Sequence, residues 1–135
     1  MVPIPDDFEL QPLATIPIKN PEAREQARLV AALRHKWSKI DNLERRPVVF
    51  SVPMGGSRDA REGASLRTQG ALAGVPDLCI VLPFGECIWL EMKAEGGRLS
   101  PFQTALHNHF AAIGHEVLVC YGAIDALTQL RKRVN

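Results

Sequence analysis

Two carboxylates stand at the open end of what the sequence predicts to be a β-hairpin. Residues 74–93 form two apolar runs, and Pro and Gly at 83–85 are typical of the turn that joins them. With residue 84 at the centre, paired positions sum to 168, which places Asp77 directly opposite Glu91. Their Cβ atoms would lie roughly 5 Å apart, where like charges are destabilising unless a cation lies between them. The spacing therefore predicts a metal site at the end of the hairpin remote from its turn.

A lysine on the second strand is expected to face the same site. Side chains alternate along a strand, so Lys93 points to the side of Glu91, one pleat further along. An isolated E-x-K sequence is often only a solvated strand edge with a salt bridge. Here the charges interrupt an apolar run that contains Ile88, Leu90 and Met92, and charges in a buried strand need partners. This setting favours a functional site over a surface ion pair.

The order of these motifs resembles that of the PD-(D/E)xK nucleases. More specifically, residues 20–130 are similar to stand-alone members of the virus-type replication–repair nuclease (VRR-NUC) family. The motifs that carry the resemblance are Gly55-Gly56-Ser57-Arg58, Gly70, Gly74-Val75-Pro76-Asp77-Leu78, Glu91-Met92-Lys93 and Leu99-Ser100-Pro101-Phe102-Gln103. Met54 departs from the family pattern, since a polar residue usually stands there.

The resemblance implies metal-assisted hydrolysis of a phosphodiester. Asp77 and Glu91, with the backbone carbonyl of Met92 and with Glu22 from the first helix, would hold one or two Mg²⁺ or Mn²⁺ ions. Oxygen ligands of this kind suit these hard cations. Lys93 would position the attacking water or stabilise the transition state, and whether it acts as the general base stays open. The expected catalytic residues are Asp77, Glu91, Lys93 and Gln103.

Two of these residues also have structural explanations. Ser100 and Gln103 form a capping box at the start of a helix, so Gln103 could cap the helix, reach the site, or do both. A glutamate in the first turn of a helix, such as Glu22, interacts favourably with the helix dipole. The resemblance favours Glu22 over its neighbour Glu25 as the metal ligand.

Nucleic-acid contacts are expected from a glycine-rich turn and the basic helix that follows it. The net charge is only +1, so affinity for nucleic acid must come from local clusters of basic residues. Gly56 lets the backbone come close to a ligand, while Arg58 and Arg61 could contact phosphates. The alternative is that these arginines are simply solvated.

The predicted elements run α-β-α-β-β-α-β-α and give an α/β fold, a mixed sheet flanked by helices. The strand at 116–121 follows a strand–helix–strand crossover and is expected to be parallel to its neighbour. This agrees with the restriction-endonuclease-like core that the resemblance implies. The remaining elements are helices at 21–40, 58–69, 101–113 and 123–131, and a strand at 47–53.

The chain is expected to divide into a Pro-rich N-terminal arm at 1–20 and, as the resemblance implies, a VRR-NUC nuclease domain at 21–135. The arm could be a loosely ordered tail, or it could pack on its own domain or on a second subunit.

The helix at 101–113 is expected to bury one apolar face and to carry two unremarkable histidines. The expected buried face consists of Phe102, Leu106, Phe110 and Ile113. His107 and His109 are two residues apart, hence on nearly opposite faces, and cannot chelate one ion. Both are interpreted as ordinary helix residues.

Composition is that of one globular domain. Of the 135 residues, 46% are hydrophobic and 23% charged. No apolar run approaches the roughly 20 residues of a membrane span, and the three cysteines fit no zinc motif. We expect reduced thiols, no membrane partner and a cytoplasmic location in a bacterial or phage-infected cell.

The expected function is that of a structure-specific DNA endonuclease similar to Holliday-junction resolvases from phages or bacteria. Branched DNA, either a four-way junction or a flap, would be the substrate. A four-way junction has two-fold symmetry, so the enzyme is expected to be a homodimer, with the arm as one possible contact. Two alternatives stay open: a restriction-type nuclease, and a catalytically silent binding or inhibitor protein on the same scaffold.

Overall fold

The computed structural model describes residues 2–10, 18–53 and 60–134, and its centre is a mixed four-stranded sheet of order β1-β2-β3-β4. β1 and β2 pair with their successors antiparallel, whereas β3 and β4 are parallel, as the crossover predicted. The strands are β1 (Val48–Ser51), β2 (Leu78–Val81), β3 (Cys87–Lys93) and β4 (Val117–Tyr121).

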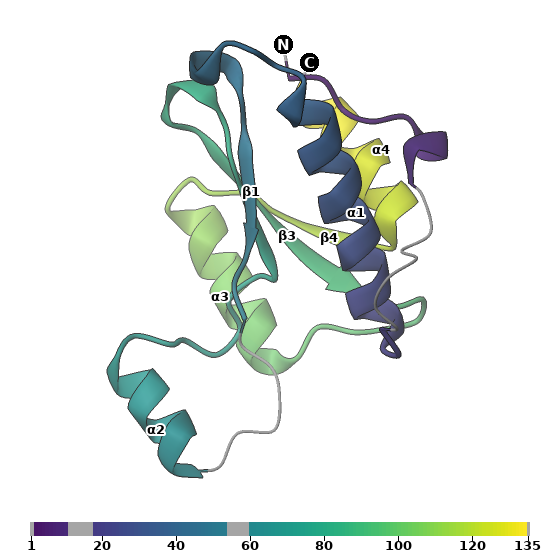
Figure 1. Cartoon of the computed structure of the whole chain (residues 1–135). Coiled ribbons are helices and arrows are strands. Elements are labelled where there is room, and N and C mark those ends of the chain that lie inside the picture. Colours follow the sequence, from purple (N-terminus) through teal and green to yellow (C-terminus); the bar gives the residue numbers. More distant parts are fainter. Residues whose placement is uncertain (1, 11–17, 54–59, 135) are drawn as a thin grey trace.

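The helices are α1 (Pro21–Ser38), α2 (Ala60–Thr68), α3 (Pro101–Ala112) and α4 (Ala123–Arg133). α1 and α4 pack against each other on one face of the sheet, α3 lies on the other, and α2 stands away from the sheet (Figure 1). The predicted order of elements is therefore confirmed, except that α2 does not cover a face. None of the helices in the described ranges is long and apolar enough to cross a membrane.

The hairpin has the predicted register. Leu78 pairs with Leu90, and near the turn the backbone N–H of Leu82 donates to the carbonyl of Glu86 at 2.8 Å. The turn is a short 3-10 segment in which Phe84 adopts a left-handed φ of 68°. Because these pairs all sum to 168, the next position beyond β2 places residue 77 opposite residue 91.

Alternation along β3 separates the core from the candidate site. Leu90 and Met92 face α1 and α4 and are almost fully buried with Leu33 and Trp37. Burying each large apolar side chain contributes about 1.5–3 kcal/mol, so this layer accounts for much of the stability of the fold. The intervening side chains, including that of Glu91, point toward α3.

The prediction of the buried face of α3 is wrong for the residues at both ends of the helix. Phe102 and Ile113 are 70% and 63% exposed, whereas His107 is only 8% exposed. The reason is tertiary: α3 packs mainly beside β4 and β3, so the side chains that meet the sheet are those of its middle turns. Phe110 forms an edge-to-face contact with Trp89 of β3, with ring centres 5.2 Å apart.

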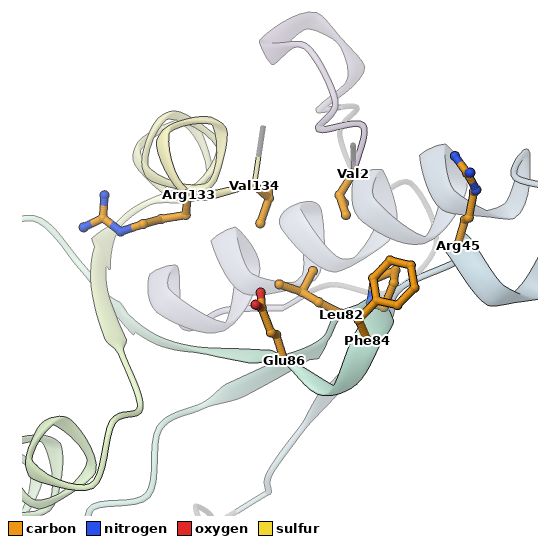
Figure 2. Close-up of a pocket in the computed structure, with 8 residues that line it drawn as sticks. Val2, Arg45, Leu82, Phe84, Glu86, Arg133 and Val134 are labelled. Atoms are coloured by element: carbon orange, nitrogen blue, oxygen red, sulfur yellow. The ribbon is translucent and has the colours of Figure 1, made fainter.

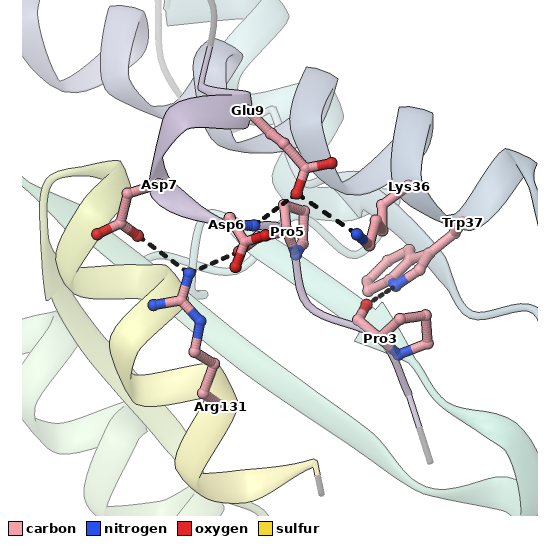
Figure 3. A network of polar contacts seen from close by, with 8 residues as sticks. All are labelled: Pro3, Pro5, Asp6, Asp7, Glu9, Lys36, Trp37 and Arg131. Atoms are coloured by element: carbon pink, nitrogen blue, oxygen red, sulfur yellow. Dashed lines mark hydrogen bonds and ion pairs between the residues drawn. The ribbon is translucent and has the colours of Figure 1, made fainter.

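The described part of the N-terminal arm packs on its own domain (Figure 3). The indole N–H of Trp37 in α1 donates to the carbonyl of Pro3 at 2.8 Å. Arg131 of α4 donates to the carbonyl of Pro5 at 2.6 Å, and Pro5 is itself buried. Residues 2–10 therefore connect α1 with α4, while 11–17 lie outside the described residues.

Candidate active site

Asp77 and Glu91 meet where the two strands of the hairpin end. Glu91 is 1% exposed, and Asp77 is half-buried just before β2. The carboxylate Oδ2 of Asp77 accepts a hydrogen bond of 2.7 Å from the backbone N–H of Met92. This bond holds the Asp77 side chain against β3 beside Glu91.

The environment of Glu91 disfavours its charged form. Burial contributes most, and a hydrogen bond and repulsion from Asp77 add to it, so that the pKa of Glu91 rises to about 9. Repulsion from Glu22 acts in the same direction, while the nearby charge of Lys93 opposes it. A carboxyl group buried this deeply beside a second carboxylate is the setting in which a divalent cation is stabilising.

A cavity of about 470 Å³ is lined by the predicted catalytic and metal-binding residues, which come from three parts of the chain. α1 contributes Glu22, the hairpin contributes both carboxylates and Lys93, and α3 contributes Gln103. The residues that line it are Asn20, Glu22, Ala23, Asp77, Glu91, Met92, Lys93 and Gln103.

The first turn of α1 positions Glu22 but gives Glu25 another role. The Asn20 side chain caps the helix by accepting from the backbone N–H of Ala23 at 3.1 Å. Glu25 instead accepts from the backbone N–H of Ala123 at 3.1 Å and caps α4. Of the two candidate glutamates, only Glu22 lines the cavity.

The first turn of α3 is held by its cap and by a close contact with the chain leading to Asp77. Ser100 and Gln103 form the predicted capping box, with the Gln103 side chain accepting from Ser100 N–H at 2.8 Å. Gly74 has a φ of +90°, and a Cβ there would lie 2.5 Å from the carbonyl oxygen of Phe102. The Gly74 backbone thus packs directly on α3, and Gln103 both caps the helix and lines the cavity.

The residues present fit a hard divalent cation. Two carboxylates, together with the carbonyl of Met92, offer oxygen ligands and leave room for water and substrate, which is how Mg²⁺ is usually held. In the described ranges no three His, Cys, Asp or Glu side chains are grouped to hold a metal ion. Glu22 therefore lines the cavity without completing a three-carboxylate cluster, and a zinc-type ligand set is absent from this part of the chain.

His107 is a site residue that the sequence interpretation missed. Its Nε2 lies 3.2 Å from Oε1 of Glu91 in the buried space between α3 and β3. A signal was present: His107 follows the motif residue Gln103 by four positions, and residues four apart share one face of a helix.

The described residues include only some of the predicted nucleic-acid contacts. Arg61 is exposed on α2, and Arg67, which was not among the predicted contacts, is exposed on the same helix. Gly56 and Arg58 lie outside the described residues.

A second cavity, of about 410 Å³, lies at the turn end of the hairpin (Figure 2). Its apolar lining includes Leu82 and Phe84, and its charged lining residues are Arg45, Glu86 and Arg133. It holds a single carboxylate among its lining residues and does not include any of the predicted catalytic side chains.

Comparisons with known proteins agree with this fold. A model of the VRR-NUC domain matches residues 20–124. Two solved structures, described as "VRR_NUC domain" and "VRR_NUC domain protein", superpose with TM-scores of 0.53 and 0.62, each at 20% identity. The first comparison covers 82% of this chain and 98% of the other, and the second covers 85% and 88%. At this identity they show the shared fold alone.

A curated phage protein is similar over a shorter stretch. "Putative nuclease p44" of Acyrthosiphon pisum secondary endosymbiont phage 1 is 44% identical over 46 residues, 34% of this chain. The matched stretch spans 50% of the length of that relative. Together with the domain match over most of the chain, the fold and the paired carboxylates, these similarities place the protein in the VRR-NUC nuclease family.

Proposed function

We propose that this nuclease is a metal-dependent, structure-specific endonuclease that hydrolyses phosphodiester bonds in branched DNA. The observation that carries the proposal is the buried Glu91 beside Asp77, in a cavity that Lys93 also lines. A structural ion pair does not explain this arrangement, because the two carboxyl groups raise rather than relieve the cost of burying charge.

Each side chain has a distinct task in this proposal. Asp77 and Glu91, with the Met92 carbonyl and with Glu22 nearby, would hold Mg²⁺ or Mn²⁺. When bound, such an ion lowers the pKa of a water molecule and neutralises charge on phosphate oxygens. Lys93 holds the attacking water or stabilises the charge that develops on the phosphate, and Gln103 orients substrate from the start of α3.

DNA as the substrate rests on the family match and on the distribution of charge, and its branched form on the resemblance alone. With a net charge of +1, the protein must bind phosphates locally, and exposed Arg61 and Arg67 on α2 supply positive charge. Contacts to phosphates carry no sequence information, which suits an enzyme that recognises the shape of DNA. Cutting both strands of a four-way junction needs two active sites, so we propose a two-fold symmetric homodimer.

The decisive experiment incubates the protein with linear duplex, flap and four-way-junction DNA in Mg²⁺, in Mn²⁺ and in EDTA. We expect cleavage of a branched substrate that requires the metal and falls about 100-fold or more in Lys93→Ala. Circular dichroism and thermal unfolding verify that the variant is folded. A folded Lys93→Ala protein with wild-type activity would overturn the assignment, and binding of junctions without cleavage would favour a catalytically silent scaffold.

A further inference from the structure

A buried histidine of α3, His107, contacts the candidate metal ligand Glu91 on β3. His107 projects from α3, is 8% exposed, and places Nε2 3.2 Å from Oε1 of Glu91. Its other ring nitrogen, Nδ1, is also buried and has no hydrogen-bond partner among the described residues. Among the described residues, the one hydrogen-bonding contact of the ring is therefore to Glu91.

Burying a histidine at this position costs free energy of folding, which indicates that its contact with Glu91 has a role. Leaving a buried polar atom unpaired costs about 1–3 kcal/mol, and an apolar side chain at this position would avoid that penalty. The neighbours on the same stretch of α3 and β3, Phe110 and Trp89, already form an aromatic contact that an apolar residue could extend. Packing alone thus favours a leucine here rather than a histidine.

The direction of the hydrogen bond follows from the chemistry of the two groups. When a cation is bound, Glu91 is ionised and only accepts hydrogen bonds, so in that state the bond must be donated by Nε2–H of His107. In the neutral ring this leaves Nδ1 as the unprotonated nitrogen, which has no hydrogen-bond partner among the described residues. The bond is made to Oε1, and an ionised carboxylate has further lone pairs with which to bind a cation.

α3 is held in place at two points, so the contact between His107 and Glu91 can fix the orientation of the carboxylate. Its first turn is fixed by the capping box and by the close approach of Gly74 to Phe102. Further along, the contact between Phe110 and Trp89 holds the helix against β3. His107 lies between these two anchors, so its ring has little freedom to move away from Glu91.

We propose that His107 is a positioning residue that holds the Glu91 carboxylate, through Nε2–H, in the orientation needed to ligate a divalent cation together with Asp77. This inference rests on the proposed function and adds a residue to its site. Partners that orient metal ligands in this way typically change metal affinity about 10–100-fold when they are removed.

The test measures Mn²⁺ binding by calorimetry, independent of cleavage, in wild type, His107→Leu and His107→Gln. His109→Leu is the matched control, because His109 lies on the same helix and is exposed. We expect His107→Leu to fold, to bind Mn²⁺ about 10–100-fold more weakly, and to need correspondingly more metal for half-maximal cleavage. The KM for DNA should stay the same, His107→Gln should recover part of the affinity because its amide can donate, and His109→Leu should bind as wild type.

Each contrary outcome has a separate meaning. Wild-type affinity in His107→Leu would overturn the positioning role, as would equal losses in the Leu and Gln variants, which would indicate packing. If His107→Leu does not fold, His107→Met, a flexible apolar replacement, takes its place in the same comparison. If wild type itself neither binds Mn²⁺ nor cuts DNA, the proposed function fails, and this result is distinguishable from a failure of the histidine assignment.

Discussion

The carboxylate of Asp77 accepts a hydrogen bond of 2.7 Å from the backbone N–H of Met92, so a side chain just before β2 is held by the backbone of β3. The same residue is the predicted metal ligand. Asp77 therefore combines a structural contact with a chemical role, and the two can be separated by substitution.

Asp77→Asn should keep the fold and lose the chemistry. The amide oxygen can still accept from Met92 N–H, but the neutral side chain is a poor ligand for a divalent cation. Asp77→Ala should lose cleavage as well and should also be less stable by about 1–3 kcal/mol, because it removes a hydrogen bond to a charged group. Chemical denaturation and a junction-cleavage assay measure the two effects, and wild-type cleavage by Asp77→Asn would contradict the ligand assignment.

Glu91→Gln should change how the stability of the metal-free protein depends on pH. The pKa of Glu91 is 4.5 when unperturbed and about 9 in the folded protein, so the unfolded chain ionises first as the pH rises. The contribution of Glu91 is therefore fully present below about pH 4.5 and is lost progressively as the pH rises toward 9. Glu91→Gln, which cannot ionise, should be the more stable protein at neutral pH in EDTA.

Thermal unfolding in EDTA between pH 5 and pH 9 checks this expectation. The melting temperature of wild type should fall relative to that of Glu91→Gln across this range, and added Mg²⁺ should raise only that of wild type. If the melting temperatures of the two proteins changed with pH in parallel, burial would not be raising the pKa of Glu91.

Gly74→Ala should displace the segment that delivers Asp77. The added Cβ would meet the Phe102 carbonyl at 2.5 Å, and the φ of +90° disfavours any side chain. Gly70→Ala is the matched control, since Gly70 has a φ of +112° but no atom within 4 Å of an added Cβ. Both variants should be destabilised by the backbone, and only Gly74→Ala should also lose cleavage by misplacing Asp77 against α3. Equal stability and equal cleavage activity of the two variants would show that the contact between Gly74 and Phe102 does not position Asp77.

Arg61→Ala and Arg67→Ala should weaken DNA binding without altering metal binding. Both side chains are exposed on α2, away from the carboxylates of the cavity. If each contacts a phosphate, its removal should reduce affinity for all DNA sequences alike and lower the salt dependence of binding by about one unit of slope. Fluorescence anisotropy at several salt concentrations measures this slope, and an unchanged slope in both variants would show that these arginines are only solvated.

Local rules explain why much of this site could be predicted from the sequence. The Pro and Gly residues around Phe84 fix the centre of the turn, and a strand period of two then determines that Asp77 faces Glu91. The caps at Asn20 and Ser100 are likewise determined by neighbours a few residues away. These features depend on short-range geometry, which the sequence contains in full.

The buried face of α3 depends instead on tertiary packing. Apolar residues occur on more than one side of this helix, and the position of β3 and β4 beneath it selects which are covered. For this reason Phe102 was expected to be buried but is exposed, and His107 was expected to be unremarkable but contacts Glu91. Glu25 caps α4 by accepting from the backbone N–H of Ala123, 98 positions away, and no pattern of neighbouring residues predicts this contact.

The most direct measurement of the central claim is a calorimetric titration of Mn²⁺ into wild type, Asp77→Asn and Glu91→Gln at neutral pH. If the two carboxylates share an ion, wild type binds Mn²⁺ and each single substitution removes most of that affinity. Binding of Mn²⁺ by either variant with the affinity of wild type would contradict a metal site formed by Asp77 and Glu91.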